Sequence, residues 1–420
     1  CHGEHIWANL ETSARLQENN HYIADLLGLA AVVAAYPNLP KARKWGEYIH
    51  NELMRCVRKQ VLDDGCCFER STRYTRLMGE MLFFAGKCFA ETPYKLPAEY
   101  FERLSILGRF LDAVTNKDGR SLQVGDNDSG RVVCISPERY DDLRLVSRLV
   151  DREIGPDAPD EAFFAEEELF YGASGRVACF PSWRGGARTF YDAGMALARY
   201  GDWSLGFFAS DGFVDESEPG HTHNDKLSFT LGFKGVPFFV DPGSGVYTRD
   251  PKVRNILRGT AQHSTLRFGN LEQNEFRGLF GYTRCGGASL DVAEADGTVV
   301  FRGATDCWAT RLGVTHKRVV EVGSEGVAVK DDVEGAAPAV AATRSFVLAP
   351  EVDVSVVGRK EAVLTCRGVS VVFCAESDIS VREGLYSPHY GAVIKSSILD
   401  VPFEYGRTNV ITVREILNED

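Results

Sequence analysis

The sequence predicts a chain of two parts, a helical N-terminal domain followed by an antiparallel β-sandwich. Over roughly the first 170 residues, apolar side chains recur three and four positions apart, which is the period of an amphipathic helix. From about Gly175 onward, short β-rich runs alternate with turns of glycine, aspartate and asparagine, the pattern of an antiparallel sandwich. We therefore expect one domain over residues 1–170 and a second over residues 171–420.

The helical period defines several separate helices. One is expected from Asn20 up to Pro37, and a second opens at Pro40. Ser71 is a good N-cap for a third helix. Further helices are expected over 98–114, 138–150 and 160–170. Antiparallel helices with short loops are typical of a bundle, an α-solenoid or an α/α toroid, and the period leaves these three open.

The strand pattern surrounds a turn-rich stretch at 220–225. An alternating run at 226–233 follows it, and a second run at 236–240 delivers Asp241 at its end. His263 then opens a third run at 265–268. Other strands are expected at 177–180, 204–208, 298–301, 327–329, 345–348, 369–374 and 408–413.

Polar residues at the ends of these strands form a candidate metal site. His221 and His223 lie in the turn, Asp241 ends one strand, and His263 begins another. Imidazole nitrogen and carboxylate oxygen suit zinc, which takes four such ligands in a tetrahedral shell. The spacing contains no compact zinc motif, so the residues alone leave a second interpretation open, in which they are polar turn residues that cap strands.

The order of motifs in this region resembles that of the heparinase II/III-like polysaccharide lyases. The matching elements are His-x-His-x-Asp, Gly-x-Pro, Asp-Pro-Gly, a tyrosine and Arg-x-Thr-x-x-His, which stand here at His221, Gly235, Asp241, Tyr247 and Arg258. Two positions depart from the family pattern. A tyrosine usually precedes the arginine, where this chain has Leu257, and an asparagine usually follows the last histidine, where it has Ser264.

The resemblance covers essentially the whole chain and implies an α/α toroid followed by a β-sandwich. The toroid is expected to be N-terminally incomplete, because members of the family have further helices before the stretch where this chain begins. The resemblance also implies one structural zinc per chain, held by His223, Asp241 and His263. It leaves His221 for the substrate.

Two residues at the start of the first clear helix are catalytic candidates. An asparagine at a helix start is ordinarily a cap, and a histidine beside it is ordinarily a packing residue. The family, however, carries an Asn-His pair at this place. The resemblance implies that Asn20 neutralises the substrate carboxylate and that His21 binds alongside it.

A second candidate segment runs over 64–74. It resembles the family's Asp-Gly, Glu-x-Ser and x-x-Tyr run, whose tyrosine transfers the proton, and this role falls on Tyr74. The family often has a histidine next, where this chain has Thr75. We also expect substrate binding by Glu69, Arg73 and Arg258. From the residues alone, Tyr74 is as well explained as a packing side chain.

A third segment, 125–131, resembles the family's Gly-Asp-x-Asp-x-Gly run. Clusters of aspartate, asparagine and glycine are common in turns. A calcium loop is disfavoured because its bidentate glutamate belongs at position twelve, whereas Glu138 is position thirteen counted from Asp126. We interpret the segment as a structural loop near the cleft.

The residue types fit β-elimination in a 4-linked uronic acid. Neutralising the carboxylate favours removal of the C5 proton, because charge develops on that group as the proton leaves. A base must take this proton and an acid must protonate the O4 leaving group. Together with this chemistry, the resemblance implies a polysaccharide lyase for a heparan sulfate-like, heparin-like or alginate-like polymer, with Asn20, His21, Tyr74 and His221 as its catalytic residues.

Two other functions stay open. An α/α toroid also houses glycoside hydrolases, which use two carboxylates, and Glu69 with Asp126 is the available pair. The incomplete toroid also fits a non-catalytic carbohydrate-binding or biosynthesis-associated protein. Product absorbing near the ultraviolet edge separates these functions, since only a lyase makes an unsaturated sugar.

Composition limits the partners. A net charge of −12 argues against nucleic acid, so an acidic polysaccharide needs a locally basic cleft. No apolar window is long enough for a membrane span, and no signal peptide is evident. The first residue is Cys1, so we expect a processed, trimmed or partial chain. The sequence leaves the oligomeric state open.

Cysteine usage and the resemblance point to different compartments. The 11 cysteines are odd in number and include no C-x-x-C pair, which favours free thiols in a reducing compartment. Lyases of the family are often periplasmic or secreted. The sequence therefore leaves the compartment unassigned.

Overall fold

The computed structural model describes residues 2–11, 19–116, 121–132, 185–211, 220–283 and 286–416. The chain divides into two compact units. A helical unit comprises Cys1–Leu122 and Ser129–Trp183, and a sandwich unit comprises Gln123–Asp128 and Arg184–Asp420. The expected domain boundary at 170/171, the expected helices at 138–150 and 160–170, and the expected strand at 177–180 lie outside the described residues.

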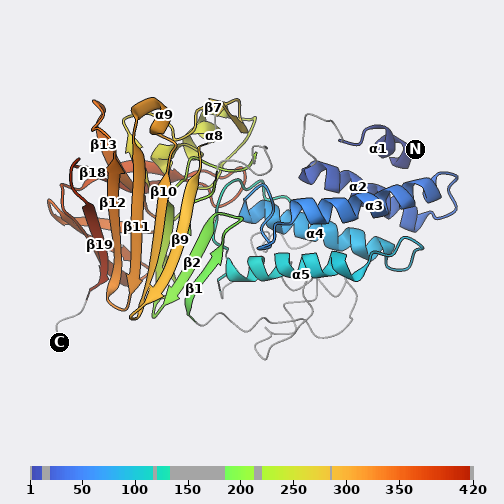
Figure 1. Ribbon diagram of the computed structural model, residues 1–420, viewed down its shortest axis with the longest axis horizontal. Helices are drawn as coiled ribbons and strands as arrows, with labels where there is room; N and C mark the ends of the chain where they lie inside the picture. The colour runs from blue at the N-terminus through green and yellow to red at the C-terminus, as the bar shows by residue number, and fades with distance from the viewer. Residues whose placement is uncertain are drawn as a thin grey trace. The chain divides into compact units, whose positions relative to one another are not determined.

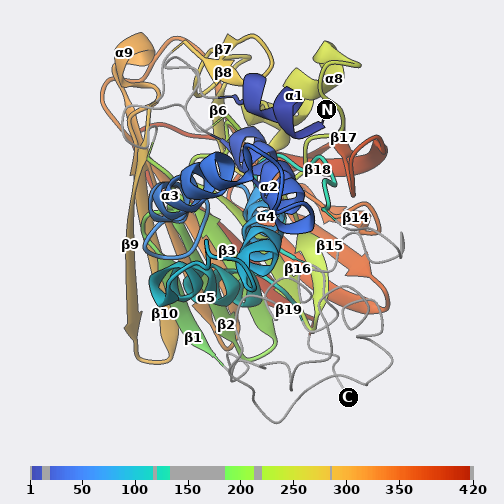
Figure 2. The ribbon, with the colours of Figure 1, turned by 90° about the vertical axis from the view of Figure 1, so that its right-hand side faces the viewer.

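Among its described residues, the helical unit contains four longer helices that lie side by side, with a short helix before them (Figures 1 and 2). Their bounds are α1 His2–Ala8, α2 Asn20–Ala35, α3 Ala42–Gln60, α4 Thr72–Phe89 and α5 Ala98–Ala113. The four helices expected in this region are therefore confirmed, each starting within about two residues of its predicted position. In the described part of the chain, no helix is long and apolar enough to cross a membrane.

The apolar stripes identified in the sequence form the interior of the helical unit. In α2, Ile23, Leu26 and Ala30 are fully buried, and the helix ends before Pro37 because proline cannot continue it. Helix α4 is buried almost all round, so it lies at the centre of the unit. The side chain of its N-cap, Ser71, accepts a hydrogen bond from Tyr74 N at 3.2 Å, which confirms the predicted cap.

The sandwich unit consists of antiparallel sheets. A five-stranded sheet follows chain order, with β1 Gly186–Phe190, β2 Met195–Tyr200, β3 Trp203–Phe208, β4 Ser228–Phe233 and β5 Val236–Phe239. A four-stranded sheet has the order β17 Ser380–Tyr386, β18 Ile394–Pro402, β13 Ala342–Val347 and β6 Leu266–Phe268.

An eight-stranded sheet forms the other layer, and several of its strands are seen side by side in Figure 1. Its order is β14 Asp353–Gly358, β15 Glu361–Cys366, β16 Val369–Ala375, β19 Asn409–Glu415, β12 Gly326–Glu334, β11 Thr315–Gly323, β10 Thr298–Thr305 and β9 Ala288–Ala295. The short elements are α8 Pro251–Leu257, η3 Thr260–Gln262, the ribbon β7 Phe276–Arg277 with β8 Gly281–Tyr282, and α9 Ala309–Leu312.

Aromatic side chains join the two layers. Phe207 of β3 stacks on Phe301 of β10 with ring centroids 5.9 Å apart, and Phe346 of β13 lies 5.2 Å from Phe373 of β16. All four rings are fully buried. This interior follows from the alternation in the sequence, which places every second side chain between the sheets. The predicted architecture, helices followed by an antiparallel sandwich, is confirmed.

Strand β13 brings together segments that are far apart in the sequence. It pairs with β6, which begins just after His263. The chain beyond its C-terminal end meets the end of β5, where Phe239 bridges to Leu348 and Val240 N donates to Val347 O at 3.0 Å. The residue after Val240 is Asp241, so this topology places a carboxylate and an imidazole at one edge of the sheets.

Candidate metal centre and active site

The loop before β4 carries both histidines of the His-x-His motif. His221 and His223 lie in the turn of residues 220–227, at the edge of the five-stranded sheet, as the sequence predicts. The backbone of this loop is tied down, because Tyr282 Oη donates to Thr222 O at 2.7 Å. The two side chains therefore start from a fixed backbone.

Asp241 and His263 enter from two other segments. Asp241 follows β5, and its Oδ1 accepts a hydrogen bond from Gly243 N at 2.8 Å. Gly243 has a φ of +73°, and a Cβ there would lie 2.6 Å from Ser387 O, so only glycine fits this turn. His263 ends η3, and its Nδ1 lies 2.8 Å from Gly259 O. Each side chain thus enters with one polar atom already bonded.

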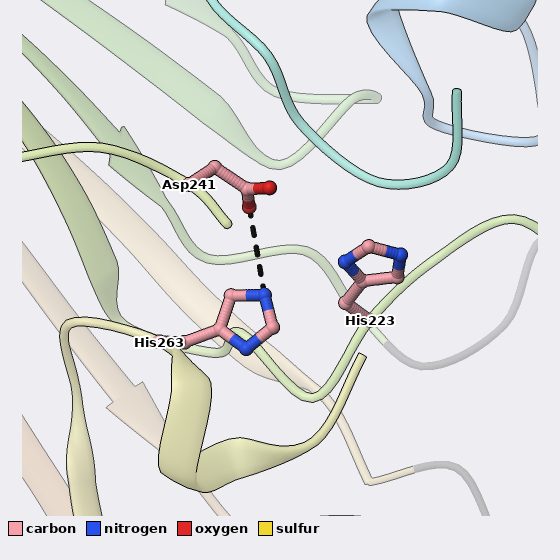
Figure 3. Close-up of side chains that lie close together, drawn as sticks. All are labelled: His223, Asp241 and His263. Carbon is pink, nitrogen blue, oxygen red and sulfur yellow. Dashed lines mark ion pairs between the residues drawn. The ribbon is translucent and has the colours of Figure 1, made fainter. Parts of the chain in front are cut away.

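His223, Asp241 and His263 converge in the interior of the sandwich unit (Figure 3). Their candidate ligand atoms all lie within 4.8 Å of one another, and His263 Nε2 lies 3.5 Å from Asp241 Oδ2. Among the residues that the structure describes, the buried atoms His223 Nδ1, Asp241 Oδ2 and His263 Nε2 have no hydrogen-bond partner. Unpartnered buried polar atoms are costly, and two imidazoles with one carboxylate are typical metal ligands. The three residues therefore form a group that can hold a metal ion.

The protonation of the two imidazoles bears on metal binding. Burial lowers the pKa of His223, although the hydrogen bond to Asp126 opposes it. Burial also disfavours the charged form of His263, but the nearby carboxylate of Asp241 outweighs this effect, so the pKa of His263 is raised. Only a neutral imidazole can bind a metal ion, so metal binding competes with protonation of His263.

Asp126 connects the metal cluster to His221. Its Oδ1 lies 2.9 Å from His223 Nε2, and its Oδ2 lies 2.8 Å from His221 Nδ1. The Arg254 guanidinium donates to both oxygens, with Nη2 2.7 Å from Oδ2. Burial alone would raise the pKa of Asp126, but Arg254 and the two histidines hold it well below its ordinary value. A single ionised carboxylate therefore lies behind both histidines of the motif.

The segment that carries Asp126 is anchored within the sandwich unit. Asp126 N donates to His221 O at 2.9 Å. Asn127 N donates to Ser244 Oγ, which in turn donates to Asn127 O, both at 2.9 Å. These bonds fix the carboxylate in relation to the His-x-His loop and to the turn after Asp241.

Aromatic rings surround the His221 side chain. The ring of Tyr247 is stacked at 6.4 Å from that of His221, and the ring of Phe280 meets it edge-on at 5.9 Å. The same two rings flank the Arg254 guanidinium at 5.1 and 5.4 Å. Since cations are attracted to aromatic faces, these rings help to hold Arg254 on the carboxylate.

Arg258 is fully buried and bonded within the same unit. Its Nε donates to Asn255 Oδ1 at 2.9 Å, its Nη2 donates to Gly278 O at 2.7 Å, and its guanidinium lies 4.1 Å from the Phe276 ring centre. These contacts favour a role in bracing the loops around the site. The expected contact of Arg258 with substrate stays a prediction.

In the helical unit, Asn20 is joined to Glu69. The Nδ2 atom of Asn20 lies 3.3 and 3.2 Å from the two carboxylate oxygens of Glu69, and both residues are buried. The cap of α2 is Asn19, whose Oδ1 accepts a hydrogen bond from His21 N. The side chain of Asn20 is thus not used for capping. The His21 ring is exposed and lies 3.1 Å from Glu11 Oε2.

Tyr74 lies in the first turn of α4, three residues after the cap. Tyr74 and Arg73 are each 4% exposed. Their expected roles, proton transfer and substrate binding, stay predictions, as do those of Asn20, His21, Glu69 and His221.

Two family models match the chain. One is described as heparinase II/III-like, C-terminal, and matches residues 184–414; the other, heparinase II/III N-terminus, matches residues 2–111. The chain belongs to the heparinase II/III-like family. The resemblance drawn from the motifs is therefore confirmed, and the two matches fall on the sandwich unit and the helical unit.

The fold of this chain is also similar to those of solved structures. Heparinase III superposes with a TM-score of 0.75 at 18% identity, over 99% of this chain and 63% of that one. The heparan sulfate lyase HepC of Pedobacter heparinus gives 0.69 at 17% identity, over 100% and 62%. The chondroitin AC lyase of Streptomyces coelicolor A3 gives 0.59 at 10% identity, over 97% and 62%. At these identities the likeness concerns the fold alone.

The chain spans less than two thirds of the length of these structures, 62 or 63% in each case. A search among curated proteins found no match to the chain.

The sequence patterns do not indicate the roles of two residues of the site, Asp126 and Arg254. The sequence predicts a structural loop at Asp126 and assigns no role to Arg254. The Gly-Asp-x-Asp-x-Gly run was the available signal for Asp126, whose partner His221 lies 95 residues further along the chain. Arg254 precedes the motif arginine Arg258 by one helical turn, and that spacing was its only signal.

Proposed function

We propose that this protein is a polysaccharide lyase that cleaves a 4-linked, uronic-acid-containing polysaccharide by β-elimination. The observation that carries the proposal is the arrangement of His221, held on a buried carboxylate next to a cluster that fits a metal ion. Membership of the heparinase II/III-like family supports it. So does the fold shared with structures named as heparan sulfate and chondroitin AC lyases.

The reaction begins at the uronate carboxylate. The C5 proton is weakly acidic, and its removal places negative charge on the adjacent carboxylate, so a hydrogen-bond donor to that group lowers the barrier. We assign this role to Asn20, whose amide is oriented by Glu69. His21 is assigned to bind alongside, and Arg73, Glu69 and Arg258 to hold the substrate.

Two side chains are assigned to proton transfer. As the C5–H bond breaks and the C4=C5 double bond forms, the C4–O4 bond breaks and O4 leaves with a proton. Tyr74 can take the C5 proton and then protonate O4 where both lie on one face of the sugar. Where they lie on opposite faces, His221 takes the C5 proton and Tyr74 protonates O4.

The metal in this proposal is a structural zinc, one per chain, on His223, Asp241 and His263. When bound, it crosslinks three loops of the sandwich unit and supplies no step of the reaction. The three unpartnered ligand atoms support this assignment. His223 stands two residues from His221, so holding one fixes the backbone of the other.

The glycoside hydrolase alternative needs Asp126 as its second catalytic carboxylate, and the contacts of Asp126 argue against that role. A glycoside hydrolase needs one carboxyl that can donate a proton and one free carboxylate. Asp126 is fully buried, is paired with Arg254 and contacts two histidines, so neither of its oxygens is available for such work.

The test is a substrate panel assayed with the full-length natural protein. Heparan sulfate, heparin, hyaluronan, chondroitin sulfate and alginate are each incubated with enzyme, and unsaturated ends are followed by ultraviolet absorbance. A lyase produces them on at least one polymer, and a His221→Ala variant produces far fewer. New reducing ends without unsaturation would overturn the proposal in favour of a hydrolase, and binding without cleavage would favour a carbohydrate-binding protein.

A further inference from the structure

The environment of Asp126 goes beyond what a merely structural carboxylate requires. Each of its two oxygens faces one histidine nitrogen and one nitrogen of Arg254. A carboxylate that receives both arms of a guanidinium is ionised, and an ionised carboxylate can only accept hydrogen bonds. The facing nitrogens, His221 Nδ1 and His223 Nε2, must therefore both carry hydrogen.

This requirement sets the tautomer of each neutral ring. Protonation of His223 at Nε2 leaves a lone pair on Nδ1, which is the buried atom that points into the metal cluster. Protonation of His221 at Nδ1 leaves a lone pair on Nε2, so the neutral ring presents a proton acceptor through its other nitrogen. One carboxylate thus prepares two histidines for two different tasks.

We propose that Asp126 is the positioning residue for both histidines, preparing His223 as a metal ligand and His221 as a proton acceptor. The part concerning His221 rests on the proposed lyase function, whereas the part concerning His223 does not. Arg254 completes the arrangement, since its guanidinium and the flanking rings of Tyr247 and Phe280 hold the carboxylate in one orientation.

The Asp126→Asn variant removes this function with little change of shape. An asparagine has only one acceptor oxygen, and its amide hydrogens would face either a histidine N–H or the guanidinium. At least one histidine must then change tautomer or orientation. Loss of such an outer-shell partner of a metal ligand typically weakens metal affinity about 10–100-fold.

The sandwich unit offers a matched control in Asp331. Its Oδ1 lies 2.7 Å from His316 Nε2, and Arg318 donates to both of its oxygens at 2.7 and 3.0 Å. Arg318 also donates to the carbonyl of Ser264, beside the ligand His263. Asp331→Asn therefore removes the same kind of buried ion pair from the same unit and loosens the same neighbourhood, but leaves both site histidines on Asp126.

The experiment compares the full-length natural protein with Asp126→Asn, Asp331→Asn and His221→Ala. Zinc affinity is measured by competition with a chromophoric chelator, and the histidine tautomers are read from ¹⁵N NMR of protein labelled at histidine. We expect about 10–100-fold weaker zinc binding and a changed His221 tautomer in Asp126→Asn. We expect zinc affinity within about twofold of wild type in the other two variants.

Two results would overturn the proposal. One is a folded Asp126→Asn protein that keeps wild-type zinc affinity and tautomers. The other is an equal loss of zinc affinity in Asp331→Asn, which would show general loosening. Should Asp126→Asn fail to fold, Arg254→Lys serves in its place, because it keeps the charge but loses the two-armed contact. Both readouts are independent of turnover, so a protein without lyase activity would still decide the part concerning His223. Where turnover is measurable, Asp126→Asn lowers kcat more than it changes KM.

Discussion

The amide nitrogen of Asn20 lies 3.3 and 3.2 Å from the two oxygens of Glu69, although 49 residues separate them in the chain. The contact fixes which way the amide faces, because only its nitrogen can donate to a carboxylate. The side chain is therefore held in one orientation before any substrate arrives, which is the condition for stabilising charge in a transition state.

Replacing Asn20 with aspartate keeps the shape and reverses this contact. The new carboxylate would face Glu69 in a buried position, so we expect a loss of about 1–3 kcal/mol in the free energy of unfolding. We also expect little remaining turnover, since the donor to the substrate carboxylate is gone. Urea unfolding and the appearance of unsaturated ends are the measurements. The double variant Asn20→Asp/Glu69→Gln should recover stability without recovering turnover, and recovery of both would contradict the role of Asn20.

Replacing Tyr74 with phenylalanine removes one hydroxyl group and leaves the ring. If Tyr74 transfers the proton, turnover on the cleaved polymer falls by about 10²–10⁴ while binding persists, the range of a positioned acid–base group. The rate of formation of unsaturated ends and an equilibrium binding assay give the two quantities. Near-normal turnover would make Tyr74 a packing residue.

The control for this variant must also remove a buried hydroxyl. Tyr22 is unsuitable as a neutral control, because its hydroxyl contacts both Tyr48 and Glu52 at 2.7 Å. Tyr100→Phe is better matched, since its hydroxyl donates only to Leu82 O among the contacts described, at 2.7 Å. It should lower the free energy of unfolding by about 1 kcal/mol and leave turnover unchanged.

Purified protein should contain one zinc per chain, and His223→Ala should contain much less. Zinc present at about 1,000 times its dissociation constant stabilises the folded state by about 4 kcal/mol, so chelation should lower the melting temperature clearly. Elemental analysis and calorimetry measure the two effects. His5→Ala, a change at an exposed histidine of α1, should keep both values. Equal zinc content in His223→Ala and wild type would refute the ligand assignment.

The core of the sandwich unit should be sensitive to acid at Asp331. Burial alone would raise the pKa of this carboxyl, but Arg318 and His316 hold it well below 3.8. A folded-state pKa below the unfolded value means that the ion pair contributes its full stability above about pH 3.8 and loses it progressively as the pH falls further. Melting temperatures between pH 7 and pH 3 test this.

Asp331→Asn should separate this contribution from other acid effects. Removing one partner of a buried ion pair costs about 3–5 kcal/mol, so the variant should melt lower at pH 7. Its melting temperature should also fall less than that of wild type between pH 4 and pH 3. Parallel pH profiles for the two proteins would show that another group controls acid unfolding.

Local patterns sufficed to predict the elements, whereas the choice of three metal ligands also needed the resemblance to the family. Helix starts such as Ser71 and strand ends such as Asp241 are written in neighbouring residues, through capping and through alternation. His223, Asp241 and His263 were found because each stands at such an end and because the family motif links them. In the structure, the three side chains that the motif links do lie close together.

Contacts between distant segments could not be predicted in this way. The Gly-Asp-x-Asp-x-Gly run marks the position of Asp126 but also fits an ordinary turn, and it does not reveal the partners of Asp126, which lie about 95 to 128 positions away. Similarly, the sequence is compatible with Asn20 as the helix cap. The structure shows that Asn19 caps α2 and that the Asn20 side chain donates a hydrogen bond to Glu69. The order of strands in the sheets could not be predicted for the same reason, because it depends on contacts between distant segments. For example, β19 at the end of the chain pairs with both β12 and β16.

The short segment Gln123–Asp128 belongs to the sandwich unit although the helical unit flanks it in the sequence on both sides. The residues of the two units therefore alternate along the polypeptide chain. A fragment starting at residue 184 would contain the whole region matched by the C-terminal family model and all three metal ligands. It would lack Asp126, the carboxylate that orients His221 and His223. Anyone dissecting this protein into separately expressed domains should expect such a fragment to bind zinc poorly until a peptide spanning residues 123–128 is supplied in trans.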